Sequence, residues 1–176
     1  MMIKNNINCV KSTSAGRLFD GLSAGLNIVG SSTFEGEGSM SLQFKAQQGS
    51  LNNFPLINIQ EYMVNENDEN ILDTTSLFTS IIVKVANKEL SVNDSALYFH
   101  LALSHMIVEA CIRERAKSGL NIVALSGGVF QNLLLLSSTK NLLIKHNFKV
   151  LTHSLVSAND GGISLGQAVV ALERMN

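Results

Sequence analysis

The last third of the chain constrains the fold most, because strand-like and helix-like segments alternate there. Strand patterns cover residues 121–126 and 148–154, and helix patterns cover residues 129–146 and 161–175. A helix that joins two parallel strands returns the chain to its starting side, so both strands end at one edge of the sheet. The pattern therefore predicts an α/β core whose two strand-to-helix loops open onto one crevice, where ligands bind in open parallel sheets.

The rest of the chain is predicted to be mainly helical. Apolar residues recur at helical spacing at Leu18, Leu22 and Leu26, and a second helical stretch with Leu42 follows a polar break over residues 30–39. The stretch over residues 59–73, which is acidic and rich in asparagine, predicts an exposed connection or a pair of short strands. Further helices are expected in the second half of residues 71–88 and over residues 91–117, with start signals at Ser91 and Asp94 and a stop at Gly119.

Composition narrows the classes of partner. The formal net charge is -1 and 15% of the residues are charged, so no basic field favours nucleic acid or a membrane surface. Apolar runs such as residues 133–136 are too short to span a membrane, and the N-terminus lacks the apolar core of a signal peptide. We expect a soluble cytoplasmic protein that binds small molecules or proteins, with Cys9 and Cys111 as reduced thiols.

Gly127 and Gly128 lie between the first predicted strand and its helix. Without Cβ atoms they let the backbone approach an oxyanion closely, and the helix amides add donors and a partial positive charge. The pair therefore suits a phosphate, although many α/β turns need a glycine for geometry alone. Asn132, one turn further, either faces a base or sugar edge or is an exposed helix residue.

Two acidic residues have two interpretations each. Asp160 precedes two glycines, so it is either a helix N-cap or an oxygen ligand for a metal that points into the crevice, with Asn159 free to act as the cap. Asp20 lies three residues after Arg17 near a helix start. The residues alone favour a surface ion pair, worth about 0.3–0.5 kcal/mol, over a carboxylate that accepts ribose hydroxyls.

The histidines of the long central helix are not expected to bind metal. His100 and His105 are five residues apart, and this spacing does not direct two imidazoles from one helix to the same metal. We expect partly buried or surface histidines.

Five motifs in series carry a resemblance to a known family. They are TSAGRLFDGLSA, FEGEGS, YFHLAL, LSGGVFQNLLLL and HSLVSANDGGISLGQAVVA, and they span nearly the whole chain. Their order and spacing resemble the C-terminal lobe of the HypF carbamoyltransferases of [NiFe]-hydrogenase maturation. The resemblance implies an α/β fold that is the second lobe of an actin-like (ASKHA) architecture, a mixed sheet with parallel strands flanked by helices, as in TsaD-like enzymes.

The resemblance also implies an activity. HypF-like enzymes make carbamoyl-adenylate from carbamoyl phosphate and ATP and pass the carbamoyl group to the C-terminal cysteine of HypE. By position, Gly127 and Gly128 would hold the nucleotide phosphate, Asn132 would face the adenosine and Asp20 would bind the ribose. Asp160 matches the metal-binding aspartate of the family's DGG motif. No catalytic residue is assigned.

The chain departs from the family pattern at several points. Residues 156–158 lack the proline that usually precedes the DGG turn, and Gln43 lies near the place of a family glutamate. The family's metal-binding histidines belong to the lobe before this one, and the acylphosphatase-like, zinc-finger and YrdC-like regions are absent. A divalent metal, whether Mg, Fe or Zn, would be completed by residues outside this chain.

The leading hypothesis is one lobe over residues 1–176. It divides into an N-terminal helical segment (1–50), a connection with helices (51–118) and a nucleotide-binding core (119–176). The expected partners are a HypE-like acceptor, the missing N-terminal portion of the enzyme, and a second copy through an exposed lobe interface. The alternatives are a non-catalytic ASKHA-like module that acts by protein pairing and a flavodoxin-like phosphate binder, and the latter does not explain the SAGRLFD motif.

Overall fold

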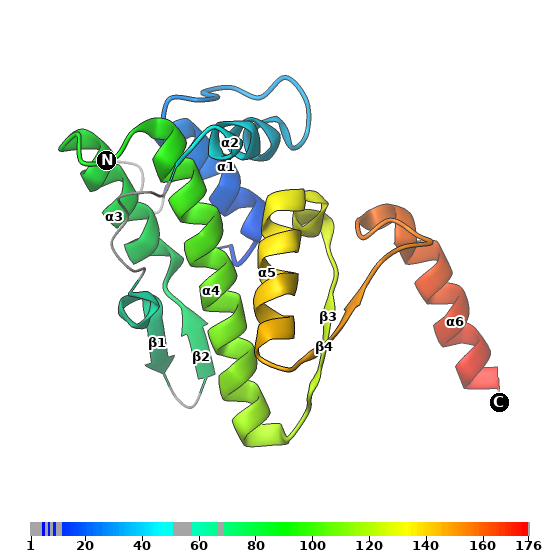
Figure 1. Cartoon of the computed structure of the whole chain (residues 1–176). Coiled ribbons are helices and arrows are strands. Elements are labelled where there is room, and N and C mark those ends of the chain that lie inside the picture. Colours follow the sequence, from blue (N-terminus) through cyan, green and yellow to red (C-terminus); the bar gives the residue numbers. More distant parts are fainter. Residues whose placement is uncertain are drawn as a thin grey trace.

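A computed structural model describes residues 5, 7, 9, 12–50, 58–66 and 69–175, and describes residues 64–66 and 69–71 by their backbone alone. Figure 1 shows the arrangement of the helices and strands. In chain order they are α1 (Ala15–Gly25), α2 (Glu37–Gln47), η2 (Ile59–Tyr62), β1 (Met63–Glu66), β2 (Glu69–Leu72), α3 (Thr74–Ala86), α4 (Val92–Ser118), β3 (Ile122–Leu125), η3 (Gly128–Gln131), α5 (Leu133–Lys145), β4 (Lys149–Thr152), η4 (Asp160–Gly162) and α6 (Ile163–Met175), where η marks a 3-10 helix.

The 27-residue helix α4 is the axis of the fold. Its start is capped by Ser91, whose hydroxyl accepts a hydrogen bond from the Asp94 amide at 3.1 Å. Its end is Gly119, which takes a left-handed conformation (φ 74°) and donates its amide to the Arg115 carbonyl. Both boundary signals of the sequence are confirmed, since they provide the capping groups that a helix end needs.

Two apolar clusters meet along α4. The larger one joins α1, α2, α3 and the N-terminal part of α4, with Phe19, Leu42 and Phe99 fully buried. The smaller one packs the C-terminal part of α4 against α5, β3 and β4 through Val108, Leu143 and their neighbours. Because both clusters share α4, this helix connects the N-terminal helices to the strand-helix-strand region.

The parallel pairing predicted for the last third is confirmed. Strands β3 and β4 pair in parallel with Ile122 opposite Lys149 and Leu125 opposite Thr152, so both strands end at the same edge. The acidic middle stretch forms a pair of short antiparallel strands, β1 and β2, one of the two alternatives that its composition left open. In the described part of the chain these are two separate sheets of two strands each.

The helix expected over residues 129–146 divides in two. Residues 128–131 form the 3-10 turn η3, and α5 starts only at Leu133. The reason is Asn132, which takes an extended conformation and caps α5 by accepting the Leu135 amide on its side-chain oxygen at 3.0 Å. An N-cap residue lies outside helical geometry, so the apolar run that follows it forms the helix alone.

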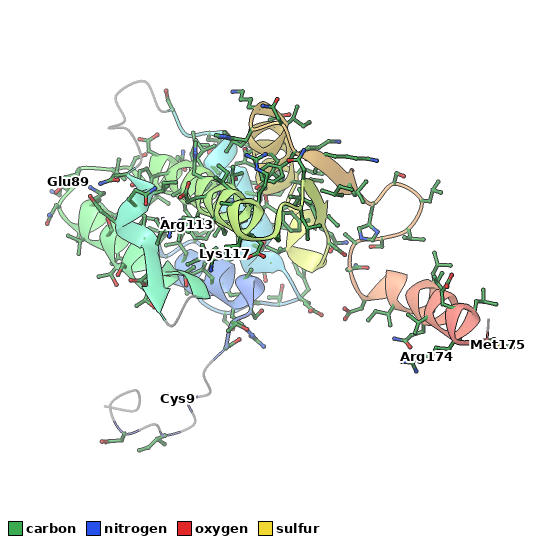
Figure 2. All side chains as sticks on the ribbon, turned by 90° about the horizontal axis from the view of Figure 1, so that it is seen from below. Cys9, Glu89, Arg113, Lys117, Arg174 and Met175 are labelled. Carbon is green, nitrogen blue, oxygen red and sulfur yellow. The ribbon has the colours of Figure 1, made fainter. Side chains whose placement is uncertain are left out.

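Helix α6 lies away from the rest of the fold. Both views show it extending beyond β4 with open space around it (Figures 1 and 2). It contains no buried residue, although Leu165, Val169 and Leu172 follow one another at helical spacing on one face. An apolar face of this kind is normally covered in a folded protein.

Among the described residues, one helix, α4, has the length and apolar composition of a membrane span. Its most apolar window is 56% buried within the chain, as expected of a central core helix. Both cysteines are free, Cys9 exposed and Cys111 half-buried, and burial raises the pKa of the Cys111 thiol.

Candidate nucleotide site

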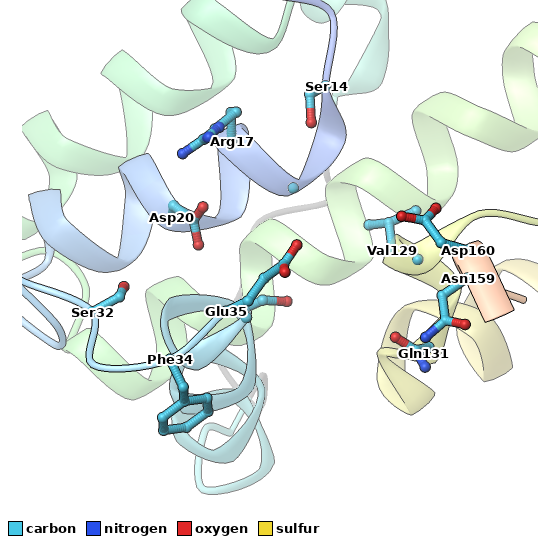
Figure 3. A pocket seen from close by; sticks show the side chains of 14 residues that line it. Ser14, Arg17, Asp20, Ser32, Phe34, Glu35, Val129, Gln131, Asn159 and Asp160 are labelled. Carbon is cyan, nitrogen blue, oxygen red and sulfur yellow. The ribbon is translucent and has the colours of Figure 1, made fainter. Parts of the chain in front are cut away.

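An open cavity of about 1110 Å³ lies between α1 and the carboxyl edge of the β3–β4 pair. Figure 3 shows Arg17 and Asp20 of α1 on one side and Gln131, Asn159 and Asp160 on the other. The full lining is Ser14, Gly16, Arg17, Asp20, Ser32, Phe34, Glu35, Gly36, Ser39, Gly128, Val129, Gln131, Asn159 and Asp160. The cavity therefore collects residues from both ends of the chain, including both loops that were predicted to share a crevice.

The loop after β3 is shaped by Gly127. Its φ of 98° lies in a region that side-chain-bearing residues rarely adopt. Its amide donates to the Ala158 carbonyl at 2.9 Å, which joins this loop to the loop after β4. Gly128 follows as a cavity-lining residue, and the amides of Gly128 and Val129 lie at the start of a helical turn, where amides have no intrahelical acceptor.

The loop after β4 takes its cap from Asn159 rather than from its acidic residue. Asn159 caps η4, since its side-chain oxygen accepts the Gly161 amide at 3.0 Å. The Asp160 carboxylate lines the cavity and is exposed. A cap supplied by Asn159 leaves Asp160 available as an oxygen ligand for a cation.

Asp20 projects into the cavity from the first turns of α1 (Figure 3). Gly38 of α2 packs against it so closely that a Cβ there would lie 3.0 Å from an Asp20 carboxylate oxygen. Arg17 also lines the cavity, and no ion pair joins it to Asp20 in the part of the chain that the structure describes. The prediction of a surface ion pair is therefore wrong. Both side chains line the cavity without pairing with each other.

Glu35 supplies a second carboxylate on the α1 side. It belongs to the loop before α2, which is closed by Glu37, whose carboxylate accepts both the amide and the hydroxyl of Thr33. Gln43, which stands near a family glutamate, is not among the lining residues. The carboxylate that accompanies Asp20 thus comes from the loop rather than from α2.

The cavity is electronegative. Its lining has three carboxylates (Asp20, Glu35 and Asp160) and one guanidinium (Arg17), so the ionised side chains sum to -2. An anionic phosphate would be repelled unless a cation accompanied it or unless it stayed close to Arg17 and the loop amides. Among the residues that the structure describes, no three His, Cys, Asp or Glu side chains come together as a metal site. A metal at Asp160 would therefore need further protein ligands from outside the described residues.

Asn132 lies behind the cavity wall, where it is 7% exposed. Besides capping α5, its side-chain amide lies 2.9 Å from Nε2 of His100. His100 is fully buried rather than partly buried or at the surface, because α1 and α5 cover its face of α4. The assignment of Asn132 to adenosine stays a prediction; in this structure its amide is bonded to protein groups.

Several lining residues were not assigned a role from the sequence. Phe34, 51% exposed, and Glu35 come from the FEGEGS motif, while Gln131 adjoins Asn132, to which a role was assigned. The motif itself was the signal for Glu35, since a carboxylate in a surface loop seldom belongs to the core. Nothing in the spacing indicated that this loop would face η3, about a hundred residues later in the sequence.

The chain matches a family described as "Carbamoyltransferase, Kae1-like Domain, second subdomain" (HypF_C_2) over residues 1–167. The chain belongs to the HypF carbamoyltransferase family. It is 30% identical over 169 residues to a "Probable carbamoyltransferase HypF" of Methanocaldococcus jannaschii, covering 95% of this chain and 21% of that protein. It is 29% identical over 171 residues to a "Carbamoyltransferase HypF homolog" of Cupriavidus necator, covering 97% of this chain and 43% of the relative.

Solved HypF structures resemble the chain as well. Full-length HypF in a phosphate- and nucleotide-bound form superposes with a TM-score of 0.86 at 30% identity, covering 99% of this chain and 22% of that one. HypF of T. kodakarensis gives a TM-score of 0.79 at 26% identity, covering 95% and 21%. The chain is thus a HypF-type, ASKHA-like lobe, and it spans less than half of the length of the HypF relatives that it matches.

Proposed function

We propose that this chain is the nucleotide-binding part of a HypF-like carbamoyltransferase, which forms carbamoyl-adenylate from carbamoyl phosphate and ATP. The carbamoyl group would then pass to the C-terminal cysteine of a HypE-like acceptor in cytoplasmic [NiFe]-hydrogenase maturation. The observation that carries the proposal is the meeting of the Gly127–Gly128 loop and the Asn159–Asp160 loop at one cavity opposite Asp20. The phosphate and nucleotide in the HypF structure that the chain resembles support the same ligand class.

The two walls of the cavity would bind different parts of the nucleotide. Gly128 and Val129 would present backbone amides to the phosphates, and Gly127 sets the turn that directs them. Asp20 would accept the ribose hydroxyls from α1, with Glu35 beside it. The two walls would hold the adenylate in a fixed orientation, which lowers the barrier to attack on its carbamoyl carbon.

A divalent cation fits the charge of this cavity. Asp160 offers a hard oxygen ligand at its rim, and the bound cation would neutralise phosphate charge beside three carboxylates. Asp160 would supply one ligand, and the remaining protein ligands would come from the rest of the enzyme.

The proposal predicts weak, cation-dependent nucleotide binding by this chain without turnover. Calorimetry with a non-hydrolysable ATP analogue should detect binding with a Kd near or below millimolar when Mg²⁺ is present, and much weaker binding in EDTA. Asp160→Asn should remove the Mg²⁺ dependence and leave stability within about 0.5 kcal/mol, since Asp160 caps nothing and is exposed. Absence of binding at several millimolar analogue by a folded chain would contradict the proposal.

A second function has one observation in its favour. The uncovered apolar face of α6 suits a module that acts by pairing with another chain rather than by catalysis. Mixing this chain with the remaining portion of a HypF enzyme separates the two functions. Release of pyrophosphate from ATP that depends on carbamoyl phosphate and on this chain would exclude a purely structural role.

A further inference from the structure

His100 is a buried titratable group in the YFHLAL stretch that the proposed nucleotide chemistry does not use. It is fully buried in the middle of α4. The rings of Phe19 and Phe99 meet its imidazole edge to face, with centroids 5.3 and 5.7 Å away. A phenylalanine or leucine would fill such an apolar site as well, so the imidazole needs a reason beyond packing.

Hydrogen bonds supply that reason. The Asn132 side-chain oxygen accepts the Leu135 amide, which leaves the Asn132 nitrogen facing Nε2 of His100 at 2.9 Å. An amide nitrogen only donates, so Nε2 must accept. Nδ1 therefore carries the proton and donates to the Ala96 carbonyl at 2.7 Å. The neutral tautomer protonated on Nδ1 therefore gives both ring nitrogens of His100 a hydrogen-bond partner.

Protonation would break the arrangement, because an imidazolium would set its Nε2–H against the donor of Asn132. Burial lowers the pKa of His100 to about 4, which keeps the ring neutral at ordinary pH. Phe19, Phe99 and Asn132, which contact the ring, are uncharged.

The position of this ring links the two walls of the cavity. Phe19 immediately precedes Asp20 on α1, and Asn132 immediately follows Gln131 of η3. Both neighbours line the cavity, from opposite sides (Figure 3). His100 thus contacts both walls one residue behind their cavity-facing side chains.

We propose that His100 is a positioning residue, which accepts the Asn132 amide and so holds η3 and the start of α5 in register with α1. This inference rests on the proposed nucleotide function for its consequence, the preorganisation of the cavity, but the hydrogen bonding itself is independent of any ligand. Preorganised loop amides lose less entropy when a phosphate binds.

Two substitutions in this chain separate positioning from packing. In His100→Gln the side-chain oxygen replaces Nε2 as the acceptor for Asn132, whereas in His100→Asn the shorter amide reaches only toward Ala96. Positioning predicts that His100→Gln keeps the backbone amide shifts of Gly128 and Gln131 and stays within about threefold of the wild-type Kd for the ATP analogue. His100→Asn should move those shifts and weaken binding about tenfold, about 1.4 kcal/mol.

The tautomer gives a readout that a packing role would not move. Nitrogen-detected or long-range ¹H–¹⁵N correlation spectra of the wild-type chain should show His100 neutral and protonated on Nδ1 at pH 7. In Asn132→Asp the cap is kept but a carboxylate faces Nε2, so the pKa of His100 should rise and the imidazolium should be present at pH 6.

Two results would overturn the proposal. One is a His100 protonated on Nε2 in the wild type. The other is that His100→Gln and His100→Asn both leave the amide shifts of Gly128 and Gln131 unperturbed. If the wild type binds no nucleotide while the tautomer and the shifts follow the expectation, the proposed function fails and the positioning role of His100 stands.

Discussion

At the residue scale, two adjacent glycines have different tasks. Gly127 sets the backbone of the turn through a φ of 98°, whereas Gly128 lines the cavity, where an added Cβ would meet nothing closer than Asn159 Cβ at 3.9 Å. The two glycines of one motif therefore have different expected roles, Gly127 in shaping the turn and Gly128 in ligand binding.

Alanine substitutions test this division. Gly127→Ala should lower the free energy of unfolding by about 1–3 kcal/mol, because alanine is strained at this φ. Gly128→Ala should change stability by less than about 0.5 kcal/mol but weaken nucleotide binding about tenfold, since its methyl group keeps a phosphate from the loop amides. Urea unfolding and calorimetry on both variants measure the two effects. Equal losses of stability would show that the division is wrong.

The sequence predicts the lining of the candidate site only for residues whose position depends on their own turn or helix start. Gly128, Asp20 and Asp160 belong to local turns or helix starts and do line the cavity. Asn132 belongs to the same motif, yet its partner His100 is 32 residues earlier and is brought close only by the packing of α5 on α4. Contacts that depend on how two helices cross leave no local pattern.

At the element scale, α4 carries the largest expected pH effect. The pKa of His100 falls from 6.5 to about 4 on folding. The unfolded chain therefore binds more protons between these values, so stability rises with pH across this window and is lost as pH falls through it. From pH 7 to pH 5 this residue alone should cost about 2 kcal/mol of stability.

Unfolding by urea at pH 5, 6 and 7 measures this dependence. His100→Gln should flatten it by about the same 2 kcal/mol, because glutamine does not titrate. His105, whose pKa is also lowered by burial, contributes in the same direction in both proteins and cancels in the comparison. Parallel curves for the two proteins would show that His100 does not cause the dependence.

Element boundaries followed from the sequence where a capping residue marked them. Ser91 and Gly119 delimit α4 as expected, and the parallel β3–β4 pair follows from the alternation of apolar segments. The start of α5 was misplaced because the apolar run around Asn132 hides its role as a cap. The extended backbone at Asn132 is accompanied by two side-chain hydrogen bonds, in which its oxygen accepts the Leu135 amide and its nitrogen donates to His100. The apolar periodicity of the sequence does not indicate these bonds.

At the scale of the whole molecule, α6 is the part that needs a partner. Leu165, Val169 and Leu172 are each about half exposed or more (52%, 51% and 62%) on a single face. The relatives are more than twice as long as this chain, so the remainder of the same enzyme is the expected cover in the assembled protein.

Without that remainder, the face should drive self-association. We expect the chain to dimerise at micromolar concentration in analytical ultracentrifugation, and Leu165→Gln combined with Leu172→Gln to make it monomeric. Val170→Gln, which makes the same kind of change on another side of α6, is the matched control and should leave the dimer intact. A wild-type monomer at high concentration, or a control as monomeric as the double variant, would exclude this face as the cause.

We propose that one cavity, built from α1, the loop before α2 and the two glycine loops, binds adenine nucleotide. An NMR titration of the ¹⁵N-labelled chain with an ATP analogue and Mg²⁺ tests it most directly, because the method reports both affinity and location. Binding in this cavity should give a saturating set of amide shifts centred on Asp20, Glu35, Gly128 and Asp160. Saturating shifts confined to another surface, or none at several millimolar nucleotide in a folded chain, would contradict it.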